Sequence, residues 1–164
     1  MTDIAFYHLT ASDAADALPQ LINKTLAAGK KALVSSSKSH IATLSTALWS
    51  HGHTAPVQGR PSYGGQGSWL PHGIAGKDDD DAALCPIWLS GETQDNPIAA
   101  EFSFYLDGMT PQNASGFDRI FILFNGLDDA AVTTARTQWK SLREEGHDLS
   151  YWTQDDSGAW KKTA

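Results

Sequence analysis

Segments with strand periodicity alternate along this chain with segments that have helical periodicity. The apolar run 4–9 precedes a segment, 15–28, whose leucines and isoleucines recur every three or four residues. A short apolar run at 31–35 and a helical pattern over 38–50 repeat this order. Parallel strands need crossover connections that pack back onto the sheet. The alternation therefore predicts an α/β fold with three layers and a mostly parallel central sheet.

The second half of the chain adds strands and one long helix. We expect strands near 86–89, 102–106 and 119–124, and a helix over 128–146. The segment 149–160 predicts a two-stranded or extended ending around an Asp-Asp-Ser-Gly turn. Proline is best tolerated in the first turn of a helix, so Pro19 suggests that the first helix begins after its alanines.

Composition indicates one cytosolic domain over 1–164. Hydrophobic residues make up 41% of the chain, enough for a core that needs no disulfides or structural metals. The single Cys85 cannot form an intramolecular disulfide. The first ten residues lack a basic segment followed by an apolar stretch, and no 18-residue apolar run occurs. The net charge of −7 argues against general affinity for nucleic acid.

The sequence lacks the usual signatures of catalysis and cofactor binding. No glycine-rich phosphate-binding fingerprint follows the first strand, and the glycines at 64–67 do not open a helix. His51 and His53 with the aspartates at 78–81 do not have a recognisable metal-ligand spacing. We therefore expect no catalytic residues, no cofactor and no metal. A small α/β enzyme, or a nucleotide- or phosphate-binding protein, that uses the carboxyl-terminal crevice of the sheet remains the alternative.

One helix face is basic although the chain is acidic. Arg136, Lys140 and Arg143, which we call the basic stripe, fall within roughly 60° on a helical wheel. His147 is expected to extend the stripe, and Trp139 borders it. Such a surface suits a partner with carboxylates and an aromatic group. The alternative is a solvated face whose long side chains cover a buried tryptophan.

Two further tryptophans are candidates for the same site. Trp49 ends the second predicted helix and points away from its apolar stripe. Trp69 closes a long loop, 51–68, rich in Gly, Pro, His and Ser. We expect Trp49, Trp69 and Trp139 to converge beside the basic stripe.

Several short motifs occur in an order that resembles the chi subunit family of bacterial DNA polymerase III. They are "FYHL" at 6–9, "ALW" at 47–49, "WLPHG" at 69–73, "WKSLREEGHDL" at 139–149 and the final tryptophan, Trp160. The resemblance extends over nearly the whole chain. It implies a Rossmann-like fold without nucleotide chemistry, in an accessory subunit of the clamp-loader assembly.

The resemblance also implies a partner. Chi proteins bind the acidic, Phe-terminated C-terminal tail of single-stranded-DNA-binding protein. The tail-binding positions carried onto this chain are Trp49, Trp69, Arg136, Trp139 and Lys140. Arg143 joins them from helix geometry rather than from the family. A psi subunit is a further possible partner, but no motif transfers its contact surface.

Two departures from the family pattern affect the expected affinity. The loop 51–68 is longer than usual and leads into the expected pocket, and Val132 stands where a further lysine would strengthen the site. We expect a dissociation constant on the order of micromolar that increases with salt. Direct binding of single-stranded DNA by stacked indoles is a further alternative, but the chain has few cations to contact phosphates.

Overall fold

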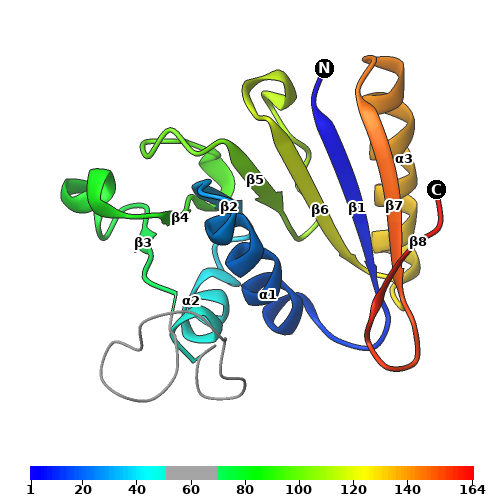
Figure 1. Ribbon diagram of the computed structural model, residues 1–164, viewed down its shortest axis with the longest axis horizontal. Helices are drawn as coiled ribbons and strands as arrows, with labels where there is room; N and C mark the ends of the chain where they lie inside the picture. Colours follow the sequence, from blue (N-terminus) through cyan, green and yellow to red (C-terminus); the bar gives the residue numbers. More distant parts are fainter. Residues whose placement is uncertain (51–69) are drawn as a thin grey trace.

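The computed structural model describes residues 1–50 and 70–164. Eight strands form one sheet in the order β3-β4-β2-β5-β6-β1-β7-β8 (Figure 1). The strands are β1 (Asp3–Leu9), β2 (Ala32–Ser35), β3 (Gly73–Ile74), β4 (Ile87–Leu89), β5 (Phe102–Tyr105), β6 (Arg119–Asn125), β7 (Asp148–Gln154) and β8 (Trp160–Lys162). The α-helices are α1 (Ala14–Ala27), α2 (Ile41–Ser50) and α3 (Asp129–Glu144).

The sheet is parallel except at one edge. Among the strands of the described ranges, all neighbours from β3 to β7 run parallel, and β8 alone pairs antiparallel, with β7. Helices α1 and α2 cover one face and α3 covers the other (Figure 1). The predicted Rossmann-like α/β fold is confirmed. None of the helices in the described ranges has the length and apolar character needed to cross a membrane.

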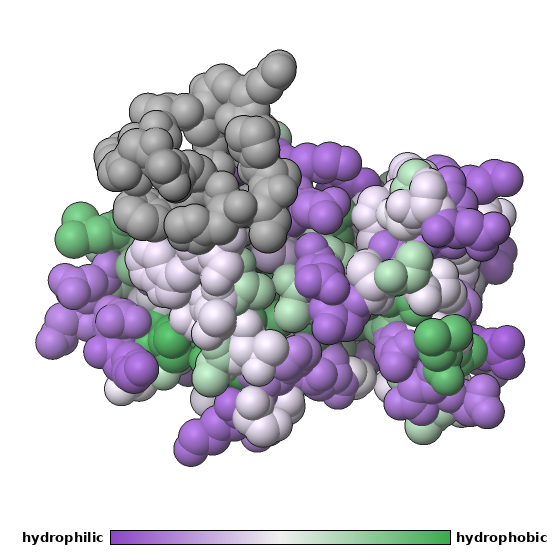
Figure 2. All heavy atoms as spheres, turned by 90° about the horizontal axis from the view of Figure 1, so that it is seen from below, coloured by the Kyte–Doolittle hydropathy of each residue, from purple (hydrophilic) through white to green (hydrophobic). Residues whose placement is uncertain are grey.

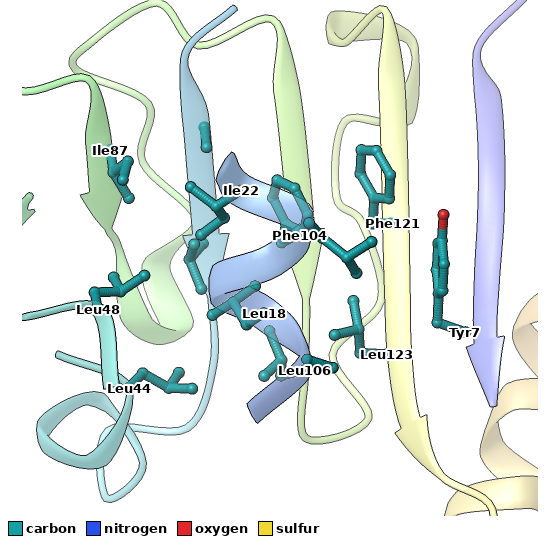
Figure 3. Packing of buried hydrophobic residues seen from close by; sticks show 14 of the residues in the cluster. Tyr7, Leu18, Ile22, Leu44, Leu48, Ile87, Phe104, Leu106, Phe121 and Leu123 are labelled. Atoms are coloured by element: carbon teal, nitrogen blue, oxygen red, sulfur yellow. The ribbon is translucent and has the colours of Figure 1, made fainter. Parts of the chain in front are cut away.

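The core beneath α1 and α2 is aliphatic at its centre and aromatic toward β1. Leu18 and Ile22 of α1 are fully buried between Phe104 and the α2 side chains Leu44 and Leu48 (Figure 3). Phe121 stacks on Phe104 with ring centroids 4.4 Å apart. The amphipathic patterns that predicted the two helices therefore mark the residues that attach them to this face.

Helix α1 begins where its alanines do, so the later start expected from Pro19 is wrong. Asp13 caps the helix, because its carboxylate accepts a hydrogen bond from the amide of Asp16 at 2.9 Å. Pro19 lies in the second turn and is buried against the core. The packing of α1 on the sheet outweighs the loss of one backbone hydrogen bond at proline.

Helix α3 ends at Glu144 rather than at residue 146, and the chain leaves the helical path before His147. Asp128 caps the start through a 3.0 Å hydrogen bond from the amide of Ala130. Gly146 has a φ of 88°, a left-handed conformation that ends the helical path. The His147 side chain is only 7% exposed and accepts a hydrogen bond from the Thr2 amide. His147 therefore does not extend the basic stripe.

The segment between α2 and β4 differs most from expectation. Helix α2 begins at Ile41 rather than near residue 38, and the short strand β3 was not predicted. The acidic stretch leads into 3₁₀ turns over Asp79–Leu84, with the Asp78 carboxylate accepting a hydrogen bond from the Ile74 amide. The long loop predicted over 51–68 lies outside the described residues.

The C-terminal hairpin has the predicted turn. The carboxylate of Asp155 accepts hydrogen bonds from the amides of Ser157 and Ala159 and from the Ser157 hydroxyl. Trp160 packs edge-on against Tyr7 of β1, with ring centroids 4.7 Å apart. This contact fixes the register of β8, because a one-residue slip would move Trp160 to the other face of the sheet.

Leu18→Ala tests the importance of the α1 core. We expect the free energy of unfolding to fall by about 2–5 kcal/mol, because the substitution leaves a cavity where Leu18 is fully buried. Urea denaturation followed by circular dichroism measures the change. The matched control, Leu127→Ala, alters a leucine that is 76% exposed and should change stability by less than about 0.5 kcal/mol. Equal losses in both variants would contradict this packing.

Candidate binding site on helix α3

The basic stripe faces the edge of the sheet formed by β7 and β8. Gln138 marks one flank of α3, where its amide donates hydrogen bonds to the carbonyls of Gly108 and Met109 near the end of β5. Trp139 marks the other flank and contacts Tyr151 of β7. Because the stripe lies beyond Trp139 on the helical wheel, it lies on the flank toward β7.

The stripe borders an aromatic cluster on the α3 face of the sheet. The Trp139 ring packs edge-on against Phe6 and Tyr151, with centroid distances of 5.2 and 5.9 Å. Trp139 and Tyr151 remain partly exposed. Aromatic edges beside cations form a surface that can contact both a phenyl ring and carboxylates.

The hydroxyl group of Tyr151 lies at the polar end of this cluster. It hydrogen-bonds with Nδ1 of His8 at 2.7 Å. Burial raises the pKa of Tyr151, and the positive charge of Arg136 acts in the opposite direction. The phenol therefore stays neutral at physiological pH, with the guanidinium group of Arg136 nearby.

Sequence reasoning missed Tyr151 and His8 as parts of this surface. Both point to the α3 face because β1 and β7 pair in parallel, with His8 opposite Thr153 and Phe6 opposite Tyr151. The available signal was the two-residue period of this chain's C-terminal segment, which places Leu149, Tyr151 and Thr153 on one face of a strand.

The cations themselves are accessible. Arg136, Lys140 and Arg143 are all exposed, and α3 presents them over about two turns. Exposed arginines can bind carboxylates in bidentate fashion, and lysine contributes a mobile positive charge. The basic stripe can therefore bind several carboxylates spaced along a peptide.

Trp49 does not join the other predicted site residues. Helix α2 packs beside β2 and β4 on the opposite face of the sheet from α3 (Figure 1). The Trp49 ring packs on His72, with ring centroids 4.8 Å apart. The expected single pocket combining Trp49 with Arg136 and Lys140 is therefore wrong. Trp69 lies outside the described residues.

The surroundings of Trp49 are polar as well as aromatic. His72 hydrogen-bonds with the Ser45 hydroxyl at 2.7 Å and with the Leu70 carbonyl at 2.8 Å. Burial lowers the pKa of His72, opposed by the hydrogen bond to Leu70 and by the negative charge of Asp78. These contacts give Trp49 a local environment separate from the basic stripe.

The carboxyl-terminal crevice, where the alternative enzyme or phosphate-binding function would be located, is acidic. A cavity of about 700 Å³ lies there, and its lining includes Asp13, Asp107 and Asp128. No lysine or arginine from the described ranges lines it. Figure 2, which views this edge of the sheet, shows a mixture of hydrophilic and near-neutral surface with separate hydrophobic patches. Carboxylates at both helix starts oppose phosphate binding.

The described residues hold no candidate metal cluster, and their one cysteine has a raised pKa. Within residues 1–50 and 70–164, no cluster of three or more His, Cys, Asp or Glu side chains could hold a metal ion. His51 and His53 lie outside this part of the chain. Burial raises the pKa of the Cys85 thiol, and the carboxylates of Asp78 and Asp81 raise it further. The reactive thiolate is therefore disfavoured.

Arg136→Ala provides a test of the contact between α3 and β7. We expect the pKa of Tyr151 to rise further, because the substitution removes a positive charge that favours the phenolate. NMR titration of labelled tyrosine rings measures the pKa, and Tyr151→Phe assigns the signal. Arg143 lies about 10 Å farther along the helix, so Arg143→Ala should change the pKa of Tyr151 less. An unchanged pKa in Arg136→Ala would separate Arg136 from Tyr151.

Comparison with known proteins identifies the family. The sequence matches the family described as DNA polymerase III chi subunit, HolC, over residues 1–57 and 63–150. No curated protein matches the sequence. The family match includes strands β1 to β6, all three α-helices and the first part of β7. The resemblance inferred from the ordered motifs is confirmed, and the chain belongs to the DNA polymerase III chi subunit family.

Proposed function

We propose that this chi subunit is a non-catalytic cytoplasmic adaptor in DNA replication. It binds the acidic C-terminal tail of single-stranded-DNA-binding protein and links that protein to the clamp-loader complex of DNA polymerase III. The observation that carries this proposal is the exposed basic stripe beside Trp139 and Tyr151 on a chain of net charge −7.

Each part of the surface has a role in this proposal. Arg136, beside the neutral hydroxyl of Tyr151, binds the terminal carboxylate of the tail. Lys140 and Arg143 neutralise acidic residues farther from the terminus. The exposed edges of Trp139 and Tyr151 contact the terminal phenyl ring.

The binding roles of Trp49 and Trp69, which the family resemblance implies, stay predictions. Trp49 stays a predicted binding residue, but its position on the α1–α2 face would give it a contact separate from the basic stripe. Trp69 also stays a prediction. A psi subunit remains a possible further partner, and we assign no residues to it.

The two alternative functions fit the charges less well. A nucleotide or phosphate in the carboxyl-terminal crevice would face Asp13, Asp107 and Asp128. Direct binding of single-stranded DNA would need cations that follow a phosphate backbone, whereas the basic stripe provides three on one helix flank. Titration with nucleotides tests the first alternative. Titration with single-stranded DNA, in the absence of single-stranded-DNA-binding protein, tests the second.

Arg136→Ala tests the proposed tail site directly. Its affinity for an acidic peptide ending in Pro-Phe should fall roughly ten-fold, because charge-assisted hydrogen bonds contribute about 1.5–3 kcal/mol. Isothermal titration calorimetry gives the dissociation constant, and circular dichroism verifies the fold.

One control variant and one further variant accompany this experiment. Lys24→Ala removes an exposed cation of α1 on the other face of the sheet and should leave the affinity unchanged. Trp49→Ala tests whether the separate contact predicted for Trp49 contributes to peptide binding. Unchanged affinity in Arg136→Ala would overturn the proposed site, and a loss in Trp49→Ala would show a second contact.

The complex should also depend on salt. Exposed charge pairs are screened over about 8–10 Å at physiological ionic strength, so the dissociation constant should increase between 50 and 300 mM NaCl, conditions we choose to span this regime. Fluorescence anisotropy of a labelled peptide measures this dependence. The slope should be smaller in Arg136→Ala, because fewer charges take part. A salt-independent dissociation constant would argue against binding through the basic stripe.

A further inference from the structure

The C-terminal hairpin places one more cation beside the basic stripe. Lys161 of β8 pairs with Thr153 of β7. Side chains of directly paired residues in an antiparallel pair point to the same face. Thr153 shares its face with Tyr151, two residues earlier on β7. Lys161 therefore projects from the face of the sheet that α3 covers.

Two observations on either side of Lys161 support this orientation. Trp160 packs against Tyr7 on the α1 face, so its neighbour Lys161 must point the other way. The carboxyl of Asp155 has its pKa lowered mainly by the hydrogen bond from the Ser157 hydroxyl and the turn amides, with a smaller contribution from the charge of Lys161. Asp155 follows β7 directly, two residues after Thr153.

Distances along the sheet bring Lys161 within reach of the tail site. Lys161 is a diagonal neighbour of Tyr151, and such pairs are about 7–8 Å apart. Tyr151 contacts Trp139 and lies near Arg136. The surface over Tyr151 and Thr153 thus has the basic stripe on one side and Lys161 on the other.

We propose that Lys161 forms the second side of the tail site, so that an acidic chain end lies between α3 and β8. This inference rests on the proposed function and adds the path of the peptide across β7. The partner it fits is a peptide with carboxylates that contact the basic stripe on one side and Lys161 on the other. Lys162 takes no part, because it pairs with Trp152 and points to the α1 face.

The two adjacent lysines give a matched experiment. Lys161→Gln and Lys162→Gln remove the same charge from neighbouring exposed positions on opposite faces. We expect Lys161→Gln to weaken binding of the acidic Pro-Phe peptide about two- to five-fold at low salt, the range typical of an exposed charge pair. Lys162→Gln should bind as the parent does. Calorimetry measures affinity, and thermal unfolding monitors the fold.

A second measurement locates the contact on the peptide. Each peptide aspartate is replaced in turn by asparagine, and each replacement is combined with Lys161→Gln in a double-mutant cycle. One aspartate should show a coupling energy with Lys161, and the same aspartate should show none with Lys162. Equal effects of the two lysine variants on affinity, or no effect of Lys161→Gln, would overturn this inference. The proposed function would still stand if Arg136→Ala weakened peptide binding. Unchanged binding in Arg136→Ala would overturn both.

Discussion

Strand β1 determines where every part of the proposed site lies. It pairs along its length with β6 on one side and β7 on the other, so both of its edges are hydrogen-bonded, and the two hydrophobic clusters cover its faces. Phe6 contacts Trp139 of α3, and Tyr7 contacts Trp160 of β8 on the opposite face. One buried strand thus positions both the helix that bears the basic stripe and the hairpin that bears Lys161.

Much of the fold could be predicted from sequence because it depends on local periodicity. Apolar spacing gave α1, α2 and α3 to within a few residues, and the turn at Asp155 followed from its residue types. The basic stripe was also predictable, since residues three, four and seven apart share one flank of any helix. The two-residue β3 lacked such a signal, because it forms only by pairing with β4.

The composition of the site depended on features that local spacing does not encode. The crossover through α1 runs from β1 toward β2, whereas that through α3 runs from β6 past β1 to β7. Right-handed crossovers in opposite directions put their helices on opposite faces. This reversal separates Trp49 from Arg136, and the pairing of β7 with β1 brings Tyr151 and His8 together. Motif order alone contained neither fact.

The aspartate caps of α1 and α3 have a consequence for how recognition can change over time. Asp13 and Asp128 engage amides at the helix starts, the backbone groups that α/β proteins commonly offer to phosphates. Recognition on the side of α3 uses exposed side chains instead of backbone. A single codon change at Arg136, Lys140 or Arg143 can therefore retune partner choice while the scaffold keeps its stability.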